Sequence, residues 1–126
     1  MKKIAIVAAF LLLTACQGTL LPPSDGIYGS DLGTTLTLQG GRCVQASVCE
    51  AVVSHYGDTP RSWSCSSGIQ TSGHAPDYQY SYTSDEVSWI IRAHFQSRTA
   101  FIADIHIAAG NTANIHQDVP FTLQSR

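Results

Sequence analysis

The chain contains few charged residues, and its lysines are confined to the first three positions. Charged side chains make up 13% of the 126 residues. From Cys16 onward, five arginines oppose nine acidic residues, which gives a formal charge of −4. Nucleic-acid binding depends on a basic stripe that displaces counterions from phosphates. The charge balance therefore argues against nucleic acid as a partner.

Short motifs that would indicate catalysis or a cofactor are missing from the sequence. There is no G-x-S-x-G pentapeptide, no glycine-rich phosphate loop, and no C-x₂-C or H-x₃-H pair for zinc. Asp85 and Glu86 are neighbours on an expected turn, where adjacent side chains point apart, so they do not form the facing carboxylates of a glycosidase. We therefore expect no catalytic residues, no metal site and no cofactor.

No hydrophobic run is long enough to cross a bilayer as a helix, which takes about 20 residues. The longest run, from Ile4 to Leu13, has ten apolar residues and follows two lysines. A basic start, a short apolar stretch and small residues at its exit are typical of an export signal. We expect residues 1–15 to be such a signal rather than a buried helix.

The end of this run carries a more specific motif. Leu13-Thr14-Ala15-Cys16 resembles the lipobox of bacterial lipoproteins, and the resemblance covers residues 1–18. It implies cleavage before Cys16 and a palmitate-type lipid on that cysteine, which anchors the protein to a membrane of the cell envelope. Gln17, which is not aspartate, implies delivery to the outer membrane, with the periplasmic face favoured over the cell surface.

Removal of the signal leaves 111 residues, enough for one domain with its own core. Residues 16–29 contain Pro22-Pro23 and show little periodicity, so we expect a lipidated N-terminus and a spacer there. Residues 30–126 are expected to form a single β-rich globular domain.

Alternating apolar residues predict antiparallel strands through most of this domain. Residues 34–39 followed by Gly40-Gly41 predict a hairpin, with Cys43 opposite Leu38. The clearest pattern is a C-terminal meander. Its core face is expected to comprise Val87, Trp89, Ile91, Ala93, Phe95, Phe101, Ala103, Ile105, Ile107, Ile115, Val119, Phe121 and Leu123.

The segments between the hairpin and the meander are less regular. Residues 47–56 have capping-box and apolar helical spacing and predict a short helix, with a second strand as the alternative. Residues 61–67 predict a strand that places Trp63 and Cys65 on one face, and residues 66–77 predict a loop. The fold class is thus mainly β, a small antiparallel β-sandwich or barrel with a C-terminal meander.

Three cysteines follow the one in the lipobox: Cys43, Cys49 and Cys65. In an oxidising compartment two of them are expected to form a disulfide. Cys65 is one expected partner. Cys43 is preferred over Cys49 as the other, because Cys43 and Cys65 both fall on faces assigned to the core.

Polar residues gather on the outer face of the meander. Arg92, His94, Asp104 and His106 alternate with core residues of one hairpin, and a paired register brings them together. They are a candidate polar surface site or pH-sensitive contact, since histidine titrates near neutral pH. Ordinary cross-strand pairing on a wet face is the preferred interpretation.

Two functions fit these features. The preferred one is a non-catalytic binding or assembly factor at the outer membrane, which offers a protein partner of the envelope an apolar groove or an open strand edge. The alternative is a periplasmic inhibitor of a hydrolase such as a lysozyme or protease. An inhibitor would offer a protruding loop, and residues 66–77 are the candidate.

Overall fold

The structure, a computed structural model, describes residues 21–49, 62–110 and 112–126. All regular secondary structure in these ranges is β-strand, and no helix there is long and apolar enough to cross a membrane. The strands are β1 (Gly26–Gly29), β2 (Thr35–Gln39), β3 (Arg42–Cys49), β4 (Ser62–Cys65), β5 (Gln70–His74), β6 (Asp77–Thr83), β7 (Ser88–Ser97), β8 (Ala100–Ala109) and β9 (Thr112–Ser125).

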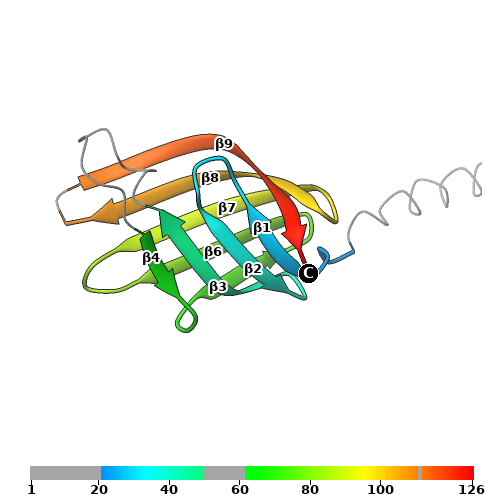
Figure 1. The fold of residues 1–126 in the computed structure, drawn as a ribbon, viewed down its shortest axis with the longest axis horizontal. Coiled ribbons are helices and arrows are strands. Elements are labelled where there is room, and N and C mark those ends of the chain that lie inside the picture. The colour runs from blue at the N-terminus through cyan, green and yellow to red at the C-terminus, as the bar shows by residue number, and fades with distance from the viewer. Residues whose placement is uncertain (1–20, 50–61, 111) are drawn as a thin grey trace, which may run out of the picture.

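The nine strands form one antiparallel sheet in the order β4-β3-β2-β1-β9-β8-β7-β6-β5. The sheet curls, so that the short strands β1 to β4 lie across the long strands of the meander (Figure 1). The fold is therefore mainly β, as predicted. Its single curled sheet is a half-barrel and matches the barrel alternative better than the sandwich.

The concave face of the sheet holds the core. Every predicted core residue of β7 and β8 is buried there, and Trp89 is only 1% exposed. An aromatic stack crosses three strands, because the Phe101 ring lies 4.6 Å from the rings of both Phe95 and Phe121. Such ring pairs add to the stabilisation that comes from buried apolar area.

The predicted hairpin between β2 and β3 is confirmed. Leu38 pairs with Cys43, and both side chains are buried. Gly40 and Gly41 form the turn with φ values of 59° and 84°. A two-residue turn of this kind needs positive φ at both positions, which glycine adopts without steric cost.

Three predicted boundaries need correction. The helix expected over 47–56 is wrong at its start, because residues 47–49 belong to β3 and pair with β4; the rest of that segment lies outside the described residues. The spacer expected over 16–29 ends too late, because β1 is an interior strand between β2 and β9. The loop expected over 66–77 contains β5.

One residue of the predicted core lies on the wrong face. Ile115 is 57% exposed, because a bulge in β9 places two residues opposite Asp104 between the Val119 and His116 pairings. Asp118 lies in this bulge with a φ of 56°. An extra residue in a strand reverses the alternation beyond it, so the side chain of Ile115 points outward.

The two edge strands of the sheet, β4 and β5, are neighbours in the sequence but have no ladder between them. Side-chain hydrogen bonds bring the two ends of the sheet together instead. The backbone N–H of Cys43 on β3 donates to Oγ1 of Thr71 on β5 at 3.1 Å. The hydroxyl of Tyr80 on β6 donates to the carbonyl of Gly41 at 2.8 Å.

Candidate functional site

The outer face of the meander places most of the predicted polar residues next to one another. Arg92 on β7 lies directly opposite Asp104 on β8, which brings these two of the four predicted residues together. His94 lies two residues farther along β7 and faces Asp77 of β6. His106 pairs with Ile90, so it lies one row from Arg92 and Asp104 and two rows from His94.

Arg92, His94 and Asp104 line one open hollow of about 600 Å³. We call it the polar hollow. It extends from edge strand β5 across the outer face to β9, and its rim also includes Ser72, Gly73, Asp77, Gln79 and Asp118. His106 is not part of its lining; it lies in a second depression with Ile90 and Ile115.

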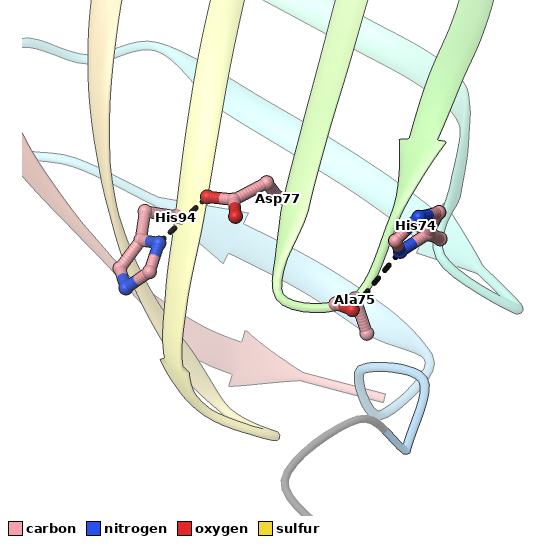
Figure 2. Close-up of polar contacts among 4 residues, drawn as sticks. All are labelled: His74, Ala75, Asp77 and His94. Carbon is pink, nitrogen blue, oxygen red and sulfur yellow. Dashed lines mark hydrogen bonds and ion pairs between the residues drawn. The ribbon is translucent and has the colours of Figure 1, made fainter. Parts of the chain in front are cut away.

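The shortest polar contact in the polar hollow joins Asp77 and His94. Nδ1 of His94 lies 2.6 Å from Oδ1 of Asp77 (Figure 2). The side chain of Asp77 is 72% exposed, and that of His94 is 62% exposed. A carboxylate beside Nδ1 favours the proton on that nitrogen and leaves Nε2 directed away from the pair. His74 makes a separate contact, to the carbonyl of Ala75 at 3.3 Å.

Arg92 forms a hydrogen bond with β6, and Asp104 forms one with β9; these strands flank the β7–β8 pair. Nε of Arg92 donates to Oε1 of Gln79 at 3.2 Å, which links β7 to β6. The backbone N–H of Asp118 donates to Oδ1 of Asp104 at 3.1 Å, which fixes the bulge of β9 against β8. Both side chains are thus held in place, but by neighbours that the sequence pattern did not identify.

The chemistry of the polar hollow suits recognition of a polar segment. Asp77, Asp104 and Asp118 oppose Arg92, so the formal charge is −2 when His94 is neutral. The hollow is open to solvent, and the side chains of Asp77, Arg92 and Asp104 already take part in hydrogen bonds. In the described ranges, no three histidine, cysteine, aspartate or glutamate side chains are close enough to hold a metal ion.

Cys43 and Cys65 are buried free thiols in the structure. Burial is the main cause that raises the pKa of Cys43 to about 12, and burial also raises the pKa of Cys65. Both sulfurs are therefore protonated at neutral pH and poor nucleophiles. Both side chains face the core as predicted, but the disulfide remains a prediction. Cys16 and the side chain of Cys49 lie outside the described residues.

Sequence reasoning missed the edge strand beside the polar hollow. β5 reads Gln-Thr-Ser-Gly-His and contains no apolar residue, so it has no hydrophobic alternation to detect. The available signal was the Ala75-Pro76 turn just before the tyrosine-rich strand β6. A polar segment joined by a tight turn to a strand is typical of an edge strand.

Comparison with known proteins identified no relative of the chain. Searches against models of protein families, curated proteins and solved structures found no match to the chain.

Proposed function

We propose that the chain is a lipid-anchored, non-catalytic binding factor of the bacterial outer membrane that holds an extended segment of a protein partner along β5. One observation carries this proposal. Among the described residues β5 pairs only with β6, and its residues Ser72 and Gly73 form part of the lining of the polar hollow. Apart from the bond of Thr71 to β3, the outer side of β5 has no ladder partner in the described ranges, and it borders the recognition surface.

The composition of β5 favours strand addition. Gln70, Ser72, Gly73 and His74 are exposed, and the strand contains no lysine, arginine or proline. Natural sheet edges are commonly protected by such residues, because an unprotected edge offers free N–H and C=O groups to another chain. In strand addition, main-chain hydrogen bonds provide affinity, and pockets for alternate side chains provide specificity.

The charge of the polar hollow indicates which side chains the bound segment of the partner carries. With three aspartates and one arginine, the hollow favours basic or amide side chains on the bound segment. Residues of an added strand alternate between the two faces of the sheet. Every second residue of the segment would therefore face the same side as Ser72 and Gln79.

The lipobox supports the proposed location. A lipid on Cys16 would hold the domain at the periplasmic face of the outer membrane, and each buried CH₂ would contribute about 0.8 kcal/mol. The rival hypothesis of a hydrolase inhibitor depended on a protruding loop over residues 66–77. The structure has β5 and a tight turn in that segment, so this supporting feature is missing.

The edge can be tested by affinity capture from solubilised envelope. The mature chain serves as bait, partners are identified by mass spectrometry, and Ser72→Lys and His74→Lys introduce charge along β5. We expect both variants to lose the partner at least tenfold, because lysine on an edge opposes strand pairing. Thr122→Lys is the matched control, since Thr122 is exposed on the interior strand β9.

Equal capture by all variants would contradict the edge mechanism, provided that thermal unfolding shows each to be folded. Amide hydrogen exchange with the captured partner gives an independent readout. We expect slower exchange over residues 70–74 in the complex and no change over residues 35–39 of β2.

The anchor is tested separately by metabolic labelling with a palmitate analogue. Cys16→Ala should abolish the label and leave a soluble or unprocessed chain, because no other cysteine occupies the lipobox position. Equal labelling of the variant and the parent would refute lipidation at Cys16.

A further inference from the structure

The end of the domain where the N-terminal segment joins the sheet carries most of the described arginines. A hollow of about 470 Å³ lies there, lined by Pro22, Asp25, Gly40, Arg98 and Arg126, together with Pro23 and Ser24. Arg42, the first residue of β3, is exposed two residues beyond Gly40. We call residues 22–25, 40–42, 98–99 and 126 the tether pole.

The strand order places these residues on adjacent elements. The turn between β7 and β8 contributes Arg98, the end of β9 leads to Arg126, and the β2–β3 turn precedes Arg42. Figure 1 shows the end of β9 beside the start of the described chain. Three of the four arginines in the described residues therefore lie at one end, and the fourth, Arg92, lies in the polar hollow.

Hydrogen bonds hold the N-terminal segment against the turn that contains Arg98. Nε of Arg98 donates to the carbonyl of Pro22 at 3.1 Å, and the N–H of Ser24 donates to the carbonyl of Arg98 at 2.8 Å. The hydroxyl of Tyr28 lies 2.7 Å from the carbonyl of Ser24 and 2.8 Å from that of Arg98. The path by which the chain leaves the sheet is thus fixed at the tether pole.

The length of chain between this pole and Cys16 is short. Five residues lie between Cys16 and Pro22, and a fully extended chain spans about 20 Å over that distance. Charges attract an anionic surface mainly within a Debye length of it, about 8 Å at physiological salt. A lipid on Cys16 would therefore keep the arginines near the membrane and let them come within a Debye length of the lipid headgroups.

The local charge is opposite in sign to that of the chain as a whole. The carboxylate of Asp25 accepts a hydrogen bond from the N–H of Gly40 at 2.9 Å. Even when Asp25 and the carboxylate of residue 126 are counted against the three arginines, the tether pole has a formal charge of +1. Asp85 and Glu86 lie at the other end of β7, about 30 Å away for a strand of this length.

We propose that the tether pole binds the phosphate groups of anionic membrane lipids and so fixes how the domain sits on the membrane. Guanidinium groups suit this role because their planar donors match the oxygens of a phosphate in a bidentate arrangement. The position of the pole near a bilayer rests on the proposed lipid anchor, but its affinity for lipid phosphate does not. Bound in this way, the domain points Asp85 and Glu86 away from the anionic surface.

The test uses the mature chain as the cell delivers it, in lipid nanodiscs of phosphatidylcholine with or without 30% phosphatidylglycerol. A gadolinium chelate on the lipid headgroups broadens nearby amide signals. We expect the amides of Ser24, Gly40 and Thr99 to broaden more in the anionic discs and that of Asp85 to remain sharp. The double variant Arg98→Gln/Arg126→Gln should show the same broadening in both discs, and Arg92→Gln should behave as the parent. Broadening that is still stronger in the anionic discs than in the neutral discs for the double variant would overturn the proposal.

A second measurement keeps the two proposals apart. If the purified chain carries no lipid, the proposal of a lipid anchor is wrong. Flotation of that chain with phosphatidylglycerol vesicles still tests whether the tether pole binds lipid. We expect each arginine to contribute about fivefold, so the double variant should bind about 25-fold more weakly than the parent. Replacing sodium chloride by inorganic phosphate at equal ionic strength should leave flotation unchanged. Equal flotation of parent and variant, or displacement by phosphate alone, would overturn lipid-phosphate binding.

Discussion

The hydroxyl of Tyr80 donates a hydrogen bond to the carbonyl of Gly41 across the gap between the two ends of the sheet, at 2.8 Å. The Tyr80 side chain is fully buried, and burial is the main cause that raises the pKa of its hydroxyl. This bond joins β6 to the β2–β3 turn without any ladder between them. It therefore helps to hold the half-barrel in its curled shape.

We expect Tyr80→Phe to lower the free energy of unfolding by about 1–3 kcal/mol, because the carbonyl of Gly41 loses its buried donor. Urea unfolding followed by tryptophan fluorescence measures the change. Tyr82→Phe, on the same strand but only partly buried, is the control and should change stability by about 0.5 kcal/mol or less. A Tyr80→Phe variant no less stable than the control would show that the contact does not stabilise the curl.

Truncation of Trp89 is expected to lower the stability of the protein more than truncation of Trp63. Trp89 is 1% exposed on the interior strand β7, and its ring stacks on that of Tyr82 at a centroid distance of 6.0 Å. Trp89→Ala should cost about 3–5 kcal/mol through lost burial and the cavity left behind. Trp63→Ala should cost less, since Trp63 is 7% exposed on the four-residue edge strand β4. Thermal unfolding of both variants decides the order, and a Trp89→Ala variant as stable as the parent would refute this role.

The cysteines provide a third prediction. In the exported protein we expect one intramolecular disulfide with Cys65 as a partner and Cys43 ahead of Cys49 as the other. Cys43 and Cys65 are both buried on the core face of neighbouring strands β3 and β4. Non-reducing peptide mapping identifies the bridge. Three free thiols in the mature protein would contradict the prediction.

In the reduced protein, stability should fall at alkaline pH. The Cys43 thiol ionises near pH 9 in the unfolded chain, whereas burial raises its pKa to about 12 in the fold. Between these two pKa values the unfolded chain binds fewer protons than the folded chain. The stability that the protonated Cys43 thiol contributes is therefore fully present below pH 9 and is lost as the pH rises. One such group costs about 1.4 kcal/mol per pH unit. The buried hydroxyls of Tyr28 and Tyr80, whose pKa values are also raised, act in the same direction above pH 10.

Urea unfolding at half-unit steps from pH 8 to pH 11 measures this loss. Cys43→Ala should reduce the slope of the curve between pH 9 and pH 10, where Cys65, whose pKa burial also raises, still contributes and the tyrosines contribute least. A free energy of unfolding that stays constant in the parent from pH 8.5 to pH 10.5 would contradict the prediction.

The sequence predicted the meander correctly because one face of each strand is apolar and the other is polar. The same alternation placed Arg92 opposite Asp104, so part of the polar hollow was predictable. It could not predict that Asp118 would bond to Asp104, because that contact depends on a bulge in β9 with no hydrophobic signature. The strand β5 was missed because none of its side chains is apolar. Residues 47–49 were misread because capping and apolar spacing suit a helix, whereas pairing with β4 stabilises a strand.

The ladder between β1 and β9 is unlike the other seven in one respect. Each of the others joins strands that follow one another in the sequence, whereas this one pairs Tyr28 with Leu123. Closing so long a loop carries an entropic cost that short hairpins avoid, and pairings between distant segments slow folding. The two halves, β1 to β4 and β5 to β9, can therefore form early and separately, and their junction completes the fold. Because a chain is made from its N-terminus, β1 remains an unpaired edge until β9 has been synthesised and can reach it.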